Sequence, residues 1–189
     1  MAKNDKLEKH RILFLFEPIT REVASELISQ LVLLDADDHG SDIDLWINSP
    51  GGSVVSGLAI IDAIQCIEAP VRTTCIGQAA SMASWILAAG KPGERSATPN
   101  AEVMIHQVIG GFSGSSATVE VYANNLLETQ GRMIQMFSRF TGRTQAQIRE
   151  DIRVDKFMTA LAAKEYGIVD RILVPFHAVG EGPGGAPAL

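Results

Sequence analysis

Several features that define specialised classes of protein are scarce or missing in this chain. Its 189 residues contain only two cysteines, and no apolar stretch approaches the length of a membrane span. Cys66 lies in a helical pattern and Cys75 in a strand pattern, which favours small core residues in a reducing compartment over a disulfide or a metal site. The 16 Lys and Arg residues form no basic stripe, which disfavours nucleic-acid binding. The N-terminus lacks the apolar core of a signal peptide, so we expect a cytoplasmic protein without membrane attachment.

What the chain does contain is the composition of an ordinary globular domain. It is 46% hydrophobic and 20% charged, with a net charge of −6. The length suits one sizeable core and leaves little room for a second. We expect a flexible polar segment over 1–10, one folded domain over 11–174, and a disordered tail rich in Gly, Pro and Ala over 175–189.

Strand and helix periodicities alternate along this domain. Helical patterns begin after Thr20 and Thr144; the remaining patterns are strands at 12–16, 43–48, 71–76, 102–106 and 168–174, and helices at 54–67, 81–89, 117–140 and 160–166. This succession predicts a parallel α/β fold, in which sites lie at the loops that follow the strands. Two such loops are rich in small residues: Pro50-Gly51-Gly52 and Gln78-Ala79-Ala80-Ser81.

The long helical pattern over 117–140 carries more apolar residues than one buried face needs. One stripe comprises Val119, Tyr122, Leu126, Met133, Phe137 and Phe140, and the residues off it include Val121, Leu127, Ile134 and Met136. One stripe suffices to dock a helix on a single core. The extra residues therefore predict a second buried face and a partner subunit. Thr144-Gln145-Ala146-Gln147 then has the pattern of a capping box opening the next helix.

Ser81 is the strongest candidate for a reactive group, because it lies where a strand ends and a helix begins. A helix N-terminus presents unpaired N–H groups and positive dipole character. A serine nucleophile needs a base within hydrogen-bond reach, and the base needs an orienting group. His106, in an apolar strand pattern, can be that base, or it can be a core histidine bonded to the backbone. The acidic cluster from Asp151 to Asp155 can supply the third group.

The glycine loops allow two interpretations. Gly51 and Gly52 can serve a turn with positive φ. Alternatively, the N–H groups of Gly52 and Met82 can stabilise an oxyanion that develops beside Ser81. Gly110 and the glycine after it can offer an extended edge, on which a substrate pairs as an added strand.

Taken together, these stretches resemble the proteolytic subunit of the Clp protease, from about Leu7 to Val174. The matching motifs are Ile47-Asn48-Ser49-Pro50-Gly51-Gly52, Gly77-Gln78-Ala79-Ala80-Ser81-Met82, Pro99-Asn100, Met104-Ile105-His106-Gln107, Gly110-Gly111, Gly131-Arg132-Met133, Thr141-Gly142 and Glu165-Tyr166-Gly167-Ile168-Val169-Asp170. The serine and histidine motifs, with the Pro-Gly-Gly loop upstream, make this resemblance highly specific.

The resemblance implies roles for individual residues. The nucleophile of the family falls on Ser81, its base on His106, and its aspartate on Asp155, with Asp151 as the second choice. The oxyanion donors fall on the backbone of Gly52 and Met82. Substrate contacts fall on Gly51, Val54, Ile109 and Gly110. The implied activity is that of a serine endopeptidase that cleaves unfolded polypeptides and short peptides and needs no metal or organic cofactor.

The resemblance also implies a fold and an assembly. The family fold is a crotonase-like spiral of ββα units with a protruding strand-helix handle, here at about 107–141. Its subunits form heptameric rings, usually two stacked, around an enclosed chamber. A separate AAA+ unfoldase ATPase supplies the substrate, and a paralogue of the same family can share the ring.

The chain departs from the family pattern at several positions. It begins a few residues before the first strand, so we expect the axial gate to be short or absent. Val108 replaces a proline of the family. In many members of the family, a polar network between the two rings is formed by residues at four positions. Here these positions carry different residues, so we expect that network to differ: Arg153, Val154, Ser115 and Thr118. These changes leave a second interpretation of the function open, in which the chain is a catalytically weak or silent ring subunit that pairs with an active paralogue. A crotonase-fold enzyme acting on acyl-CoA thioesters is a further alternative, which the Ser81 and His106 motifs disfavour.

Overall fold

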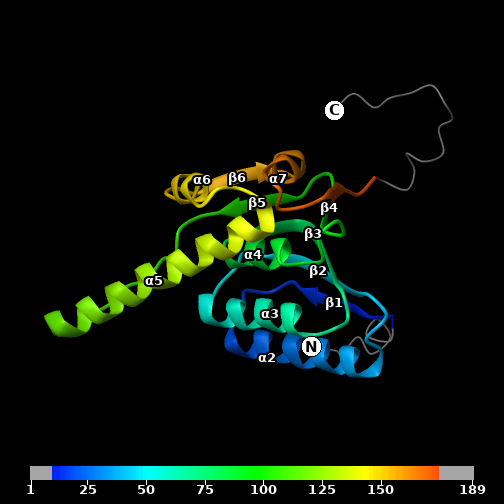
Figure 1. Cartoon of the computed structure of the whole chain (residues 1–189), viewed down its shortest axis with the longest axis horizontal. Coiled ribbons are helices and arrows are strands. Elements are labelled where there is room, and N and C mark those ends of the chain that lie inside the picture. The colour runs from blue at the N-terminus through cyan, green and yellow to red at the C-terminus, as the bar shows by residue number, and fades with distance from the viewer. Residues whose placement is uncertain (1–9, 175–189) are drawn as a thin grey trace.

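A computed structural model describes residues 10–174 of the chain, and Figure 1 shows their arrangement. The tail expected over 175–189 and the flexible segment expected over 1–10, apart from its last residue, lie outside the described residues. The strands are β1 (Ile12–Leu15), β2 (Ile43–Ser49), β3 (Val71–Ala80), β4 (Ser96–Ala97), β5 (Glu102–Ile105), β6 (Lys156–Thr159) and β7 (Arg171–Ile172). The helices are α2 (Arg21–Asp37), α3 (Val54–Cys66), α4 (Met82–Ala88), α5 (Ser116–Thr141), α6 (Gln145–Asp151) and α7 (Ala160–Tyr166).

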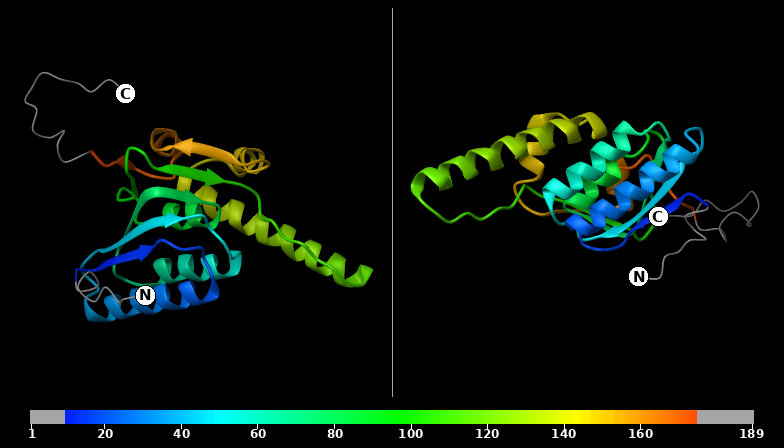
Figure 2. Two further views of the ribbon diagram at one scale, coloured as in Figure 1. Left: turned by 180° about the vertical axis from the view of Figure 1, so that it is seen from behind. Right: turned by 90° about the horizontal axis from the view of Figure 1, so that it is seen from below.

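The strands form one mixed sheet in which parallel pairs predominate. Its main path runs β1-β2-β3-β4-β7, and β5 pairs with both β3 and β6. Every pair is parallel except β5 with β6. In β2, Ile43, Leu45 and Ile47 are fully buried, and Figure 2 shows α2 and α3 side by side over the adjoining part of the sheet. The prediction of an α/β fold built on parallel strands is confirmed.

Two strands differ from the sequence prediction. The third strand runs on to Ala80 instead of ending at Ile76, because Gly77 adopts a φ of +83° and the pairing register with β2 shifts between Ile47 and Ser49. Such a bulge lets the strand change direction without ending it. The last strand is only β7, since the Ile168 N–H caps α7 by donating to Ala163 O. The short β4 has too few residues to give a periodic pattern, and the sequence analysis missed it.

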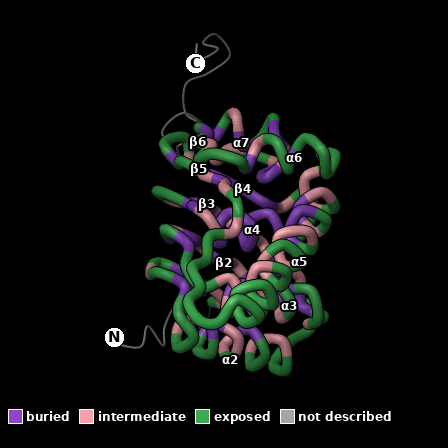
Figure 3. The backbone as a smooth tube through the Cα atoms, turned by 90° about the vertical axis from the view of Figure 1, so that its left-hand side faces the viewer, coloured by how far each residue is buried: buried purple, intermediate pink, exposed green. Residues whose placement is uncertain are grey.

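The long helix α5 is half packed and half exposed. Met133, Ile134 and Phe137 are buried, whereas Val119 and Tyr122 are 37% and 51% exposed. Ile134, which lies off the predicted stripe, is therefore part of the core, whereas Val119 and Tyr122, which lie on the stripe, are not. The helix docks only by its C-terminal half, and its first turns extend away from the sheet (Figure 1) and are mostly exposed in Figure 3.

Trp85 joins α4 to the packed half of α5. Its ring stacks on Phe137 with 4.3 Å between centroids, and its indole N–H donates to Met133 O at 3.3 Å. A buried indole that satisfies its polar atom in this way stabilises the contact. The helix that follows Ser81 is thereby fixed against the core.

Three smaller predictions have mixed outcomes. Thr20 caps α2 and Thr144 caps α6, each accepting a backbone N–H. The Gln147 side chain donates forward to Asp151 and does not accept the Thr144 N–H, so within the described residues the capping box is only half formed. Cys75 is buried, and burial raises the pKa of its thiol to about 12. Cys66 is exposed at the end of α3, so its assignment to the core was wrong.

An ion pair between Arg95 and Asp170 joins the ends of α4, α5 and β7. The guanidinium bonds both Asp170 oxygens, at 2.6 and 2.9 Å, and also donates to Phe140 O at 2.8 Å. The Arg95 side chain is only 8% exposed. Burial by itself would raise the pKa of Asp170, but its hydrogen bonds with Arg95 and with the Gly93 N–H outweigh burial and lower it.

Replacing Asp170 with Asn should destabilise the fold by about 3 kcal/mol at neutral pH, because it leaves the Arg95 charge buried without its partner. A lowered folded-state pKa contributes stability above the unfolded pKa, and this stability is lost as pH falls through the folded value. The difference between Asp170→Asn and the parent should therefore be largest at neutral pH and shrink below about pH 4.

Urea unfolding of the two proteins at several pH values measures this difference. The matched control is Glu94→Gln, which removes the neighbouring Glu94–Arg171 pair, whose side chains are 32% and 49% exposed. We expect that control to change the free energy of unfolding by less than about 1 kcal/mol. Equal effects of the two substitutions would contradict the assigned importance of the Arg95 pair.

Candidate active site

Ser81 lies in a strained turn between β3 and α4. Its φ and ψ are 53° and −129°, a conformation that costs a non-glycine residue energy and that occurs often at functional sites. Its N–H donates to Met104 O at 2.9 Å, which anchors the turn to β5. Although Ser81 occupies the N-cap position, its hydroxyl makes no capping bond. The hydroxyl is therefore available to a side chain.

The Pro-Gly-Gly loop packs directly against this turn. A Cβ at Gly51 would lie 2.6 Å from Ala80 O and 2.7 Å from Ser81 Cβ, so only glycine fits there. Gly51 has a φ of +89°, its N–H donates to Ser49 Oγ, and its carbonyl accepts the Ile19 N–H at 2.8 Å. Gly51 thus lies buried beneath the site with both backbone groups bonded inside the protein.

His106 reaches Ser81 because their strands are parallel neighbours. Ala80 lies opposite Met104 in the β3–β5 pairing, so Ser81 and His106 follow the same edge of the sheet. His106 Nε2 lies 2.8 Å from Ser81 Oγ, and Nδ1 lies 3.2 Å from Asp155 Oδ1. A carboxylate only accepts, so the position of Asp155 beside Nδ1 favours the tautomer in which Nδ1 carries the proton and Nε2 accepts from the serine hydroxyl. The contacts of the His106 ring are therefore with two side chains, and the alternative of a core histidine bonded to the backbone does not fit them.

The two candidate carboxylates have different partners. Asp155 faces His106, and its side chain is 59% exposed. Asp151 is 9% exposed and bonds Lys156 Nζ at 2.5 Å, the Tyr166 hydroxyl at 2.9 Å and Gln147 Nε2 at 3.1 Å. The structure therefore brings Asp155 to Ser81 and His106, and it holds Asp151 in a separate cluster.

A pocket of about 170 Å³ opens beside the serine and the histidine. Several of the residues expected from sequence line it, namely Gly52, Val54, Ser81, Met82, His106 and Ile109. Gly110 does not line it and lies beside Leu126 and Phe112. Within residues 10–174, no hydrogen bond takes up the N–H of Gly52 or of Met82. Both amides are therefore free to bond a group that enters the pocket.

Trp85 and Met133 line the same pocket, and the sequence analysis did not assign them there. Trp85 follows Ser81, the N-cap of α4, by four residues, so helical spacing alone places both on one side of the helix and could have indicated that they share the pocket. Met133 comes from α5, and no local pattern connects it with Ser81. Both residues are largely apolar, so they add apolar surface to the pocket.

Two features are absent from residues 10–174. This part of the chain contains no group of three His, Cys, Asp or Glu side chains that could hold a metal ion. None of its helices combines the length and hydropathy needed to cross a membrane.

Comparison with models of known protein families gives a match that is consistent with this geometry. The family described as Clp protease matches residues 2–175, which includes every element of the sheet and every residue around the pocket. The chain belongs to the Clp protease family of peptidases.

Proposed function

We propose that the protein is a serine endopeptidase subunit whose catalytic residues are Ser81, His106 and Asp155. The observation that carries this proposal is the continuous relay from Ser81 Oγ to His106 Nε2, at 2.8 Å, and from His106 Nδ1 to Asp155, at 3.2 Å. Both distances suit a serine whose base is already oriented by a carboxylate.

In this mechanism, Ser81 Oγ bonds the carbonyl carbon of a peptide and its proton passes to His106 Nε2. The imidazolium then donates that proton to the departing amine as the C–N bond breaks, leaving an acyl-serine. Water attacks the acyl carbon, His106 takes a proton from it, and Ser81 leaves with that proton. Asp155 stabilises the charged imidazole in both steps.

The free N–H groups of Gly52 and Met82 are the proposed oxyanion donors. Both residues line the pocket with Ser81, and preorganised donors there act on the charge that develops in the transition state. Val54 and Ile109 are proposed to flank the substrate, and Gly110 to border the edge along which it extends. Gly51 is proposed to act from below, by shaping the turn that presents Ser81.

The family relationship supports a proposed assembly. We propose a crotonase-like spiral in which residues 107–141 form the handle, heptameric rings that stack in pairs, and an AAA+ unfoldase ATPase that supplies unfolded polypeptides, in the cytoplasm. The exposed apolar side chains on the outer turns of α5 favour a partner subunit there; they are Val119, Val121, Tyr122 and Leu127.

A fluorophosphonate probe tests the nucleophile directly, since it bonds only an activated serine. We expect the assembled parent protein to be labelled at Ser81 and Ser81→Ala to be unlabelled. Ser25→Ala, which removes an exposed hydroxyl on α2, is the matched control and should be labelled like the parent. An assembled parent ring that takes no label would overturn the peptidase proposal and favour the silent ring subunit.

A further inference from the structure

The carboxylate that faces His106 has little to hold it in place. Asp155 lies in the short turn between α6 and β6, and its side chain is 59% exposed. Among the described residues, His106 is the only partner of that carboxylate in a hydrogen bond or ion pair. An exposed side chain with one contact keeps much of its rotational freedom. Its position therefore depends on how firmly the turn itself is held.

Asp151 closes this turn from within. It is the last residue of α6, and it bonds the ammonium of Lys156, the first residue of β6, at 2.5 Å. Its other oxygen accepts the Tyr166 hydroxyl at 2.9 Å, which ties the turn to α7. The Asp151 side chain is only 9% exposed, unlike the carboxylate it supports.

The same turn is joined to both neighbours of His106. Lys156 lies opposite Ile105 in the β5–β6 pairing, and the Gln107 N–H donates to Ile152 O at 2.8 Å. The segment between these two points carries Asp155. Any loosening of the closure between Asp151 and Lys156 would therefore change the position of Asp155 relative to His106.

The protonation states around Asp151 favour a stable contact between the two ends of the turn. Burial raises the pKa of Asp151, but hydrogen bonds from Lys156, Gln147 and Tyr166 outweigh burial and leave the pKa below its ordinary value. Burial, with the hydrogen bond to Asp151, raises the pKa of Tyr166, so its hydroxyl keeps the proton that it donates. Lys156 Nζ and the Arg143 guanidinium also lie over the Tyr166 ring, at 5.5 and 5.0 Å from its centroid.

We infer that Asp151 is a positioning residue, which acts through Lys156 and Tyr166 to hold the turn that aligns Asp155 with His106. This inference rests on the proposed peptidase function. The two carboxylates of the acidic cluster then have different roles. The exposed Asp155 contacts the imidazole, and the buried Asp151 fixes the backbone that carries Asp155.

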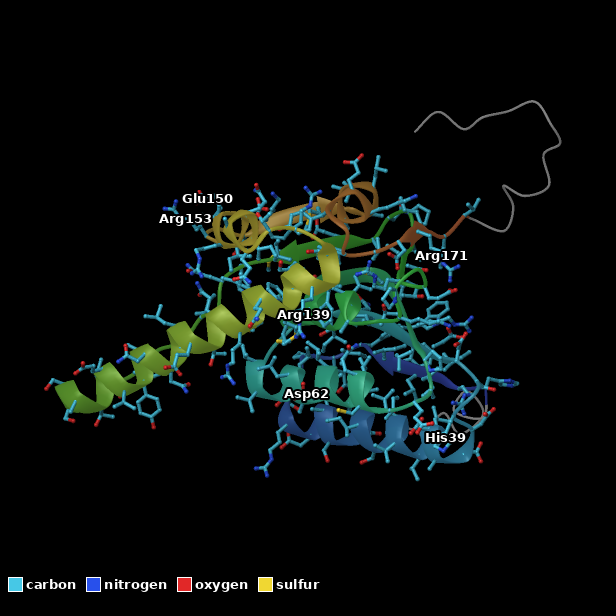
Figure 4. The ribbon with its side chains drawn as sticks, viewed as in Figure 1. His39, Asp62, Arg139, Glu150, Arg153 and Arg171 are labelled. Atoms are coloured by element: carbon cyan, nitrogen blue, oxygen red, sulfur yellow. The ribbon has the colours of Figure 1, made fainter. Side chains whose placement is uncertain are left out.

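Asp151→Asn is the first test, because it keeps the volume and removes the charge that binds Lys156. We expect kcat for a short fluorogenic peptide to fall about 10-fold to 100-fold, the range for a misplaced catalytic group, while KM stays within about twofold. Glu150→Gln is the matched control on the adjacent residue. The Glu150–Arg153 pair is about 70% exposed on both sides and points away from the sheet (Figure 4), so its loss should leave kcat unchanged.

A double-mutant cycle separates positioning from general stability. With Asp155→Ala there is no carboxylate left to align, so adding Asp151→Asn should lower kcat no further. Independent losses that multiply in the double variant would overturn the inference, as would an unchanged kcat for Asp151→Asn.

If the Asp151→Asn variant does not assemble, Tyr166→Phe takes its place in the double-mutant cycle. It removes only the hydroxyl that holds Asp151, so we expect a smaller loss of kcat that again disappears in the Asp155→Ala background. A loss that persists there, or no loss at all, would overturn the inference. Ser81→Ala is measured in the same series: if it retains activity, the proposed function fails, and if it is inactive while Asp151→Asn keeps the parent kcat, only the positioning role fails.

Discussion

Replacing His106 with alanine is expected to lower kcat for hydrolysis of a short fluorogenic peptide by about 10⁶-fold, with KM changed far less. His106 Nε2 lies 2.8 Å from Ser81 Oγ, so the variant loses the only base within reach of the serine proton among the described residues. A neutral serine hydroxyl is a weak nucleophile without that base. Removing the base should therefore be nearly equivalent to removing the nucleophile.

The effects of replacing Ser81 and His106 are expected not to add, which is the most specific test of this prediction. Ser81→Ala, His106→Ala and the double variant should have similar residual rates, because each abolishes the same proton transfer. His39→Ala is the matched control: that histidine lies just beyond the C-terminal end of α2 (Figure 4), is exposed, and has Asp35 as its only bonding partner among residues 10–174. A His106→Ala variant within tenfold of the parent rate would contradict the assigned base.

The second large effect is expected at Asp155. Its carboxylate lies 3.2 Å from His106 Nδ1, and a carboxylate there stabilises the tautomer that leaves Nε2 free to take the serine proton. Asp155→Ala should lower kcat by about 10⁴-fold, less than the loss of His106, because the imidazole remains and can still act in a minority of orientations.

Comparison with two other aspartates checks this assignment under identical conditions. Asp62→Ala changes an exposed carboxylate on α3 (Figure 4) and should leave kcat unchanged. Asp151→Ala should lower kcat far less than Asp155→Ala, since Asp151 contacts Lys156 and Tyr166 and not His106. The opposite order of these two losses would show that the acid of the relay has been assigned to the wrong residue.

Much of the secondary structure follows from local patterns in the sequence. Thr20 marks the start of α2, and Gly167, with a φ of +94°, ends α7. At that position a Cβ would lie 2.4 Å from Thr141 O, so the residue that stops one helix also permits close packing against another. Alternating strand and helix patterns were sufficient to predict the parallel α/β fold, because parallel strands need a long crossover connection, which is usually a helix.

The conformation at Ser81 could not be predicted from its neighbours. The sequence around it lacks the flanking glycines of a nucleophile elbow, yet its φ is 53°. Space for the turn comes from Gly51, thirty residues earlier, and its anchor comes from Met104 in another strand. A strained backbone angle of this kind persists only where the surrounding tertiary structure holds it.

The exposure of the apolar residues along α5 could likewise not be predicted from their periodicity in the sequence. The repeat of apolar residues continues through most of the helix, but only its C-terminal half meets Trp85 and the core. Periodicity identifies a face of a helix and does not identify how much of that face another element covers. The same limit explains why Met133 was not assigned to the pocket beside Ser81.

The sequence by itself determined which residue types could perform the chemistry and that Ser81 and His106 lie where strands end. The family resemblance ranked Asp155 above Asp151, but only the tertiary structure gives a physical reason for that order. Both are acidic and lie four residues apart, so no local signal ranks them without the family resemblance. The pairing of β5 with β6 directs one carboxylate to His106 and leaves the other bonded to Lys156 and Tyr166. Side-chain partners across a sheet depend on strand register, and register is settled by the packing of the whole domain.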